Sequence, residues 1–301
     1  MLEAYGRKAQ QERTFTMQNS KKEGSWNNVP AGTLNAVEIK LFGEELGNQG
    51  ERVITQLHTD QKFLHKAGQF LLCGGIEPSI DQRIVRAIMG KNYFGPEDWV
   101  KLYGASFTKK QLREVSHFPW NEEILMSTCP LCGKIVRDCH FAHVGLETIQ
   151  DSPLTIVKFR EFYPETGRPK FYAYGTAWYN NNDFAKVITL KLRWYLTHLE
   201  IVPESESKTT QEQQAMLPAE YELPLAIEET FKSFHCFRKT GNYLNPKRYA
   251  RCQDLSSGGY RVYVGSFNSD GFIVFNFSDD DSGGILGAGA SRKVPTQTSK
   301  T

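Results

Sequence analysis

Three cysteines and two histidines lie within fifteen residues, in the stretch CPLCGKIVRDCHFAH at positions 129–143. Thiolate sulfur and imidazole nitrogen are ligands that zinc prefers in proteins. Two residues separate Cys129 from Cys132, so one tight turn can direct both sulfurs at one ion, and Gly133 permits the positive φ that such a turn needs. The stretch therefore predicts a zinc site, and this turn forms its first half.

The second half of the stretch offers three donors for two ligand positions. If the segment is helical, Cys139 and His143 are four residues apart on one face, and His140 and His143 are three apart on nearly the same face. We favour Cys139 with His143 and hold His140 in reserve. The spacing between Cys132 and Cys139 is shorter than in Cys2His2 fingers, which argues against an ordinary DNA-reading finger. The alternative is that the thiols are small hydrophobic core residues.

The expected role of the zinc ion is structural. Four local protein ligands would complete its tetrahedral coordination, whereas a catalytic zinc keeps one position for water or substrate. A nuclease or hydrolase with its site near His140 and His143 is the enzymatic alternative. It would need a further His or Asn downstream, and NNND at 180–183 is more simply explained as a turn.

Residues 31–128 have the apolar spacing of helices. Ser79 and Gln82 form the sequence pattern of a capping box, Pro96 occupies a first-turn position, and Gly104 is a typical helix end. The spacing predicts three short helices, at 79–90, 95–104 and 108–115.

Beyond the cysteine stretch the hydrophobic period changes from about 3.6 to about 2. Residues 147–205 contain three runs rich in β-branched and aromatic residues, LTIVKFREFY, PKFYAYGTAW and VITLKLRWYLTHLEIV. Such runs are typical of strands, so we expect an antiparallel β meander. The zinc-binding element, residues 129–146, would then staple the junction between the helical and strand regions.

The remaining segments are distinguished by their polarity. Residues 206–220 are predicted as a linker, and 221–293 as a small mixed α/β C-terminal module with one helix and three strands. Residues 1–30 and 294–301 are too polar to bury much surface, so we expect a disordered lead-in and a frayed tail. Met17 is an alternative start. The predicted class is α+β.

Composition limits the classes of partner. The chain has 301 residues, with 36 Lys plus Arg against 34 Asp plus Glu. Such a balance creates no overall electrostatic field that would attract nucleic acid or an anionic membrane surface. No stretch approaches the roughly 18 apolar residues of a membrane span, and cysteines grouped with histidines favour metal ligation in a reducing compartment. We therefore expect a cytoplasmic protein without a membrane partner.

The stretch at 96–116 has the outline of a helix-turn-helix. Its second helix carries Lys109, Lys110 and Arg113, which could contact phosphates. Acidic residues in the same stretch, Glu97, Asp98 and Glu114, dilute this charge. An ordinary helical hairpin with a solvated face is therefore the favoured interpretation.

The acidic run Asp279–Asp281 follows a predicted strand, with Asn268 and Asp270 in the turn before that strand. Clustered oxygen ligands can bind calcium. Consecutive acids cannot all face one ion, so a solvated turn is favoured over calcium.

Two longer stretches resemble known sequences. IVRAIMGKNYFGPEDWVKLYGASFTKKQL and GGYRVYVGSFNSDGFIVFNFSDDDSGGILGAGASRK look like the front and closing parts of uncharacterised proteins from uncultivated bacterial lineages. The CPLCGK element resembles the knuckle of zinc ribbons. The last segment, with YELPLAIEETFKSF and GAGASRK, is similar to C-type-lectin-like modules of formylglycine-generating-enzyme relatives, although it lacks their tryptophan-rich middle and paired catalytic cysteines. This similarity implies a fold only.

These observations favour a non-enzymatic binding or assembly protein with a structural zinc site and a macromolecular, protein partner. The alternatives are a nucleic-acid-binding protein that uses the 96–116 helices and the zinc element, and a zinc-stapled nuclease or hydrolase.

Overall fold

A computed structural model describes residues 39–72 and 75–295 of the chain. They divide into two compact units, residues 1–69 and 70–301. The described part of the first unit is helical: a π-helix (η2, Ile39–Glu45), a 3-10 turn (η3, Gly47–Gln49), α3 (Gly50–Thr59) and the start of α4 (Gln61–Leu72). The predicted lead-in, residues 1–30, lies outside the described residues, as does most of the predicted tail.

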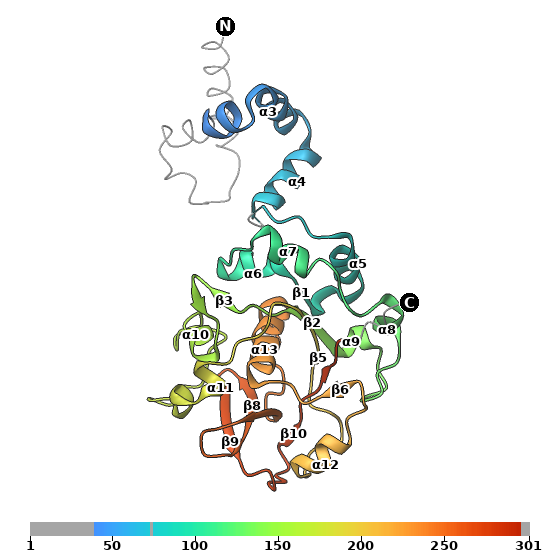
Figure 1. The fold of residues 1–301 in the computed structure, drawn as a ribbon, viewed down its shortest axis with the longest axis vertical. Coiled ribbons are helices and arrows are strands. Elements are labelled where there is room, and N and C mark those ends of the chain that lie inside the picture. The colour runs from blue at the N-terminus through green and yellow to red at the C-terminus, as the bar shows by residue number, and fades with distance from the viewer. Residues whose placement is uncertain (1–38, 73–74, 296–301) are drawn as a thin grey trace. The chain divides into compact units, whose positions relative to one another are not determined.

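The second unit contains helices and two larger sheets, which confirms the α+β class (Figure 1). Its longer helices are α5 (Ile80–Met89), α6 (Pro96–Tyr103) and α13 (Ala226–Thr240). The shorter ones are α7 (Lys109–Glu114), α8 (Glu122–Met126), α9 (Val136–Cys139), α10 (Ile156–Arg160), α11 (Asp183–Lys186), α12 (Thr210–Ala215), and the 3-10 turns η4 (Gly90–Asn92) and η5 (Trp178–Asn181).

One sheet has the order β1-β2-β5-β11-β6. Its strands are β1 (Tyr93–Phe94), β2 (His140–Val144), β5 (Trp194–His198), β11 (Ser291–Arg292) and β6 (Tyr221–Glu222). β1 runs parallel to β2, and the other pairs are antiparallel. The sheet therefore joins segments from both ends of the second unit.

The other large sheet has the order β10-β7-β8-β9. Its strands are β7 (Tyr249–Leu255), β8 (Arg261–Asn268), β9 (Gly271–Phe277) and β10 (Leu286–Ala288), and β3 (Thr148–Ile149) and β4 (Ser152–Pro153) form a separate hairpin. β7, β8 and β9 are antiparallel, and β10 is parallel to β7. The three C-terminal strands and the preceding helix were predicted, and the structure confirms them.

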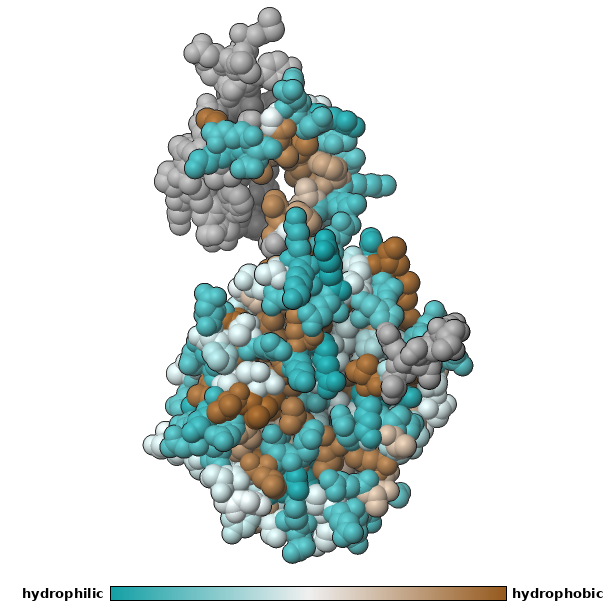
Figure 2. Space-filling model, in the orientation of Figure 1, coloured by the Kyte–Doolittle hydropathy of each residue, from teal (hydrophilic) through white to brown (hydrophobic). Residues whose placement is uncertain are grey.

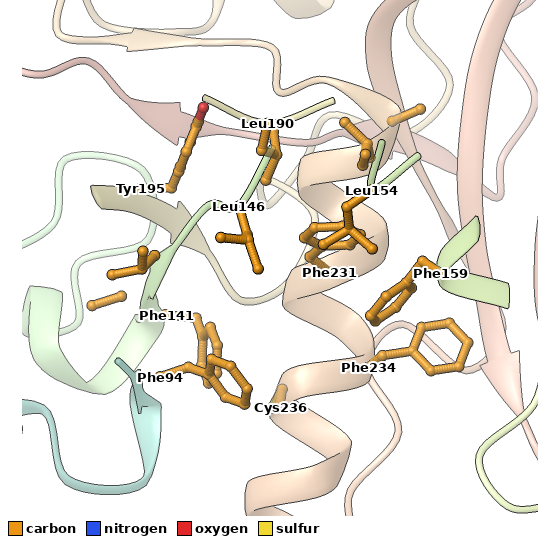
Figure 3. Close-up of a cluster of buried hydrophobic side chains, with 14 of the residues drawn as sticks. Phe94, Phe141, Leu146, Leu154, Phe159, Leu190, Tyr195, Phe231, Phe234 and Cys236 are labelled. Carbon is orange, nitrogen blue, oxygen red and sulfur yellow. The ribbon is translucent and has the colours of Figure 1, made fainter. Parts of the chain in front are cut away.

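Helix α13 contacts strands of both large sheets, namely β2, β5, β7 and β8. Phe231 and Phe234 project from it into a cluster of buried side chains that includes Phe94 and Phe159 (Figure 3). The helix begins where the Asp254 carboxylate accepts a hydrogen bond from the Ala226 N–H. Since the buried residues of this helix belong to the same cluster as buried residues from 85–196, residues 221–293 are not a module with a separate core.

The predicted N-terminal helices are confirmed as α5, α6 and α7. Ser79 and Gln82 form a capping box at α5, and Pro96 occupies the first turn of α6. Gly104 ends α6 in the left-handed conformation, with φ of 64°.

The predicted meander is wrong, because β5 is the only strand of the large sheets within residues 147–205. Its first run forms α10, where the Thr155 hydroxyl caps the helix and Ile156 and Phe159 are both buried. Short apolar runs fit both the helical and the strand period. In this run the Thr155 cap and the three-residue spacing of the buried side chains favour the helix. Residues 206–220, predicted as a linker, contain α12, in which Thr210 and Gln213 are buried.

Candidate metal centre

Four side chains of metal-binding type lie together at one end of the β2–β5 pair. The sulfurs of Cys129, Cys132 and Cys139 and a ring nitrogen of His198 all lie within 4.8 Å of one another. Zinc–ligand bonds of about 2.0–2.3 Å place tetrahedral ligand atoms roughly 3.5–3.8 Å apart. The four atoms are therefore close enough to coordinate one ion.

Cys129 and Cys132 lie on a turn that the backbone closes. The Cys129 N–H donates to the Lys134 carbonyl at 2.7 Å, and the Gly133 N–H donates to the Cys129 carbonyl at 2.9 Å. Gly133 has φ of 72°, which confirms the predicted need for glycine. The Leu131 and Lys134 amides donate to the sulfurs of Cys129 and Cys132 respectively. This turn therefore aims two sulfurs at one point and stabilises negative charge on them.

Cys139 and His198 are positioned by strand pairing. Cys139 is the last residue of α9, and His198 is the last residue of β5. His198 lies opposite His140 in the antiparallel register, and the Leu199 N–H donates to the Cys139 carbonyl at 2.8 Å. Two donors far apart in the sequence are thus brought together by one pair of strands.

The hydrogen bonding of His198 leaves one ring nitrogen available to an ion. Nδ1 lies 2.8 Å from the Glu200 carbonyl oxygen, so Nδ1–H donates and Nε2 carries the lone pair. Among the described residues Nε2 is buried without a hydrogen-bond partner. Metal-binding histidines commonly donate their other N–H to a carbonyl in this way, and a buried nitrogen without a partner is costly. This nitrogen therefore fits a metal ligand.

His140 lies beside the cluster and is not one of its four members. Its Nδ1 is 3.2 Å from the Cys139 sulfur, and its Nε2 is 3.1 Å from the Tyr221 hydroxyl. Arg292 donates to the same hydroxyl at 3.1 Å. With the Tyr221 hydroxyl donating to Nε2, Nδ1–H donates to the sulfur. Such contacts orient a ligand and stabilise its thiolate.

The electrostatics of the cluster favour a cation. The hydrogen bond from Cys139 lowers the pKa of the Cys129 thiol, and the same contact raises the pKa of Cys139. Burial raises the pKa of Cys132. A divalent cation would favour the thiolate at all three positions.

The cluster is enclosed by protein on most sides. Cys129, Cys139 and His198 are buried, and Cys132 is half-buried. Four protein donors are the number that a closed tetrahedral site requires.

The structure does not bring His143 to the cluster. Residues 140–144 form a strand, so successive side chains alternate between its faces, and His140 and His143 point to opposite sides. The His143 ring stacks on Tyr195, with ring centroids 5.4 Å apart, and lies 6.1 Å from the ring of His235. Its helical spacing from Cys139 depended on a helix that ends at Cys139.

His198 was missed because no local pattern marks it. It lies in an apolar strand 59 positions after Cys139, and only the pairing of β2 with β5 places it at the cluster. A lone histidine in such a run more often packs in the core.

The acidic run near residue 280 is engaged within the protein. Asp279 accepts hydrogen bonds from Arg261 and Thr210, and Asp281 accepts one from the Gly283 N–H.

Comparison with protein-family models, curated proteins and solved structures finds no match for this chain. Within the described residues, no helix has the length and apolar character required to cross a bilayer.

Proposed function

We propose that this chain is a non-enzymatic binding protein whose fold is stapled by one structural zinc ion on Cys129, Cys132, Cys139 and His198. The observation that supports this proposal is that four sulfur and nitrogen donors converge, three of them from buried side chains. A nuclease or hydrolase would need an open metal position, which four protein ligands do not leave. Reduced thiolates are also stable in the cytosol, which supports a cytoplasmic location.

The structural consequence of such an ion follows from what its ligands join. Cys129 and Cys132 belong to the turn before α9, Cys139 ends α9, and His198 ends the central strand β5. Lys232 of α13 donates to the His198 carbonyl at 2.7 Å. An ion at the cluster would therefore connect the turn, the first sheet and the buried helix. Metal binding of this kind contributes directly to folding free energy.

Metal analysis of reduced, purified protein tests the proposal. We expect about one zinc per chain, and we expect His198→Gln to lower the zinc content while His143→Gln leaves it unchanged. Both histidines are buried in neighbouring strands, so His143→Gln is a matched control for core disruption. Cobalt in place of zinc should show tetrahedral, thiolate-ligated absorption. Metal-free reduced protein, or equal zinc loss in both variants, would refute this ligand set.

Binding to nucleic acid through the α6–α7 region is a second candidate, and one observation favours it. Glu97 and Asp98 are buried in the structure. They are two of the acidic residues that offset the positive charge of residues 96–116 in the sequence. Arg86 pairs with both, and Lys239 pairs with Asp98 at 2.9 Å.

The exposed side chains of this region are consequently more basic than the sequence indicates. They include Lys101, Lys109, Lys110 and Arg113, against the single exposed acid Glu114. Retention of duplex DNA and of RNA measured at several salt concentrations tests this candidate. Steep loss of retention with salt, reduced by a triple substitution of Lys109, Lys110 and Arg113 with Gln, would support it. Salt-independent retention or none would exclude it.

A further inference from the structure

The cysteine cluster is buried unevenly, and Cys132 is its open side. The other three members are 0–4 % exposed, whereas Cys132 is half-buried. Gly133 and Lys134, which follow it in the turn, are exposed. Of the three sulfurs in the cluster, that of Cys132 is therefore the one that a reagent from solution meets first.

The surface of the second unit is accessible to a small polar reagent. Figure 2 shows mainly hydrophilic residues on its visible face, with hydrophobic residues in separate groups. Hydrogen peroxide is small and polar, so it needs no apolar pocket to reach a half-buried sulfur. Access for an oxidant therefore depends only on the exposure of the sulfur itself.

Zinc binding would keep the Cys132 sulfur in its reactive form. The thiolate, and not the thiol, is both the metal ligand and the nucleophile. The Lys134 N–H donates to this sulfur and stabilises its negative charge. Cys236 and Cys252, by contrast, are buried thiols outside the cluster. Among the described cysteines, exposure and thiolate character, on which oxidation depends, thus coincide at Cys132.

Cys129 is well placed to react with an oxidised Cys132. The two residues are the first and fourth of one turn, in which the Gly133 N–H donates to the Cys129 carbonyl at 2.9 Å. The first and fourth residues of a tight turn have Cα atoms less than about 7 Å apart, and disulfides join Cα atoms about 4.4–6.8 Å apart. The two sulfurs lie within 4.8 Å of each other, so side-chain rotation can bring them to the roughly 2.05 Å of a disulfide.

Cys139 is less suited to this reaction, although its sulfur lies within the same 4.8 Å. The Leu199 N–H donates to the Cys139 carbonyl at 2.8 Å, which ties this residue to the segment after β5. Its sulfur also lies 3.2 Å from His140 Nδ1. Cys139 thus belongs to the strand framework, and the shared turn favours Cys129.

We infer that Cys132 is a site of reversible oxidation by peroxide, which forms a Cys129–Cys132 disulfide and releases the zinc ion. The inference rests on the proposed structural zinc, and it names how zinc binding is regulated. Disulfides in the cytosol are usually transient and redox-sensing, so cellular thiols would restore the reduced site.

The reaction has two steps. In the first, the Cys132 thiolate attacks hydrogen peroxide: an S–O bond forms, the O–O bond breaks, and hydroxide leaves with the electron pair. In the second, the Cys129 thiolate attacks the oxidised sulfur: the S–S bond forms, the S–O bond breaks, and a second hydroxide leaves. Two thiolates are thus oxidised to one disulfide while one peroxide is reduced.

The disulfide would remove two of the four zinc donors. Cys139 and His198 alone are two ligands short of a tetrahedral site. The turn at 129–134 would then lose its link to the end of β5, where the Lys232 ammonium group of α13 donates to the His198 carbonyl at 2.7 Å. Oxidation at the surface would therefore loosen the turn from the core.

Titration of reduced, zinc-loaded protein with hydrogen peroxide tests the inference. A chromogenic chelator follows zinc release, and peptide mapping locates disulfides. We expect about one zinc released per peroxide consumed, a Cys129–Cys132 disulfide in the same samples, and recovery of zinc binding after dithiothreitol and zinc are added. Zinc retained after peroxide treatment, zinc released without a disulfide, or a disulfide between any other pair of cysteines would overturn the inference.

Two variants separate oxidation at Cys132 from general loss of the fold. Cys132→His keeps a zinc ligand at this position and removes the thiol, so we expect it to hold zinc at peroxide concentrations that empty the wild-type site. Cys236→Ser removes a buried thiol outside the cluster and should release zinc as the wild type does. Equal zinc release from Cys132→His, or resistance of Cys236→Ser, would contradict the assignment.

The wild-type disulfide map decides the question if histidine at position 132 fails to hold zinc. Zinc content before oxidation separates the two proposals. Reduced wild-type protein without zinc contradicts the structural zinc, whereas zinc bound both before and after peroxide treatment contradicts only the oxidation of Cys132.

Discussion

Replacing Glu228 with Gln should change how the stability of this protein depends on pH. The Glu228 carboxylate is buried at the start of α13, where Thr197 donates to it at 2.8 Å and Ser291 also donates. Burial is the main cause that raises its pKa from 4.5 to about 7, and the two hydroxyls and Arg193 oppose this shift. Gln keeps the shape and a carbonyl acceptor but carries no charge.

The sign of the effect follows from proton binding. Between pH 4.5 and pH 7 the folded chain holds a proton on Glu228 and the unfolded chain does not, so raising the pH favours unfolding. At about 1.36 kcal/mol per pH unit, the full effect on the free energy of unfolding is on the order of 3 kcal/mol. Most of this change, about 2–3 kcal/mol, falls between pH 5 and pH 8.5.

Urea denaturation of both proteins at several pH values provides the measurement. Other groups titrate in both, so the informative quantity is the difference in free energy of unfolding between Glu228→Gln and the wild type. This difference should move in favour of the variant by about 2–3 kcal/mol from pH 5 to pH 8.5. Glu222→Gln, at an exposed position on β6, is the matched control. A difference that stays constant over this range would show that the buried carboxyl is not protonated by folding.

Three further substitutions test other parts of the fold. Cys132→Ser should expose residues 120–150 to protease, because metal binding and folding are linked; peptide mapping that shows unchanged resistance would contradict a structural metal. Gly271→Ala should lower stability by about 1–3 kcal/mol in thermal denaturation, since its Cβ would meet the Tyr172 backbone, whereas Gly284→Ala should have little effect. Asp254→Ala should cost about 0.5–2 kcal/mol in urea denaturation, because the Ala226 N–H loses its acceptor; an unchanged midpoint would contradict the capping role.

Local features were the most predictable part of this protein. The capping box of Ser79 and Gln82, the helix end at Gly104 and the turn conformation of Gly133 depend on residues only a few positions apart. The same applies to the cysteines of the CPLCGK turn. Their geometry is encoded in short stretches, so sequence patterns identify them.

The prediction of a β meander was wrong because residues 147–205 contain short apolar runs that fit both the helical and the strand period. α10 forms there because the Thr155 hydroxyl caps it and the Phe159 ring packs against Phe231 of α13. The burial of α13 was equally hidden. Its sequence has polar residues at Glu229 and Lys232, which are buried as an ion pair at 2.7 Å. Because charged residues usually mark an exposed helix face, the sequence does not indicate that both sheets cover this helix.

By itself, the sequence determined the α+β class, the capped helices, the C-terminal strands and three of the four members of the candidate metal site. Only the tertiary structure decided the fourth. His143 is near the cysteines in sequence, but strand alternation turns it into the core, while the register of β2 with β5 places His198 beside Cys139. The close approach of the Tyr172 backbone to Gly271 likewise joins two segments that are distant in the sequence. Local patterns carry information over a few residues, whereas these sites are assembled by pairing between segments that are distant in the chain.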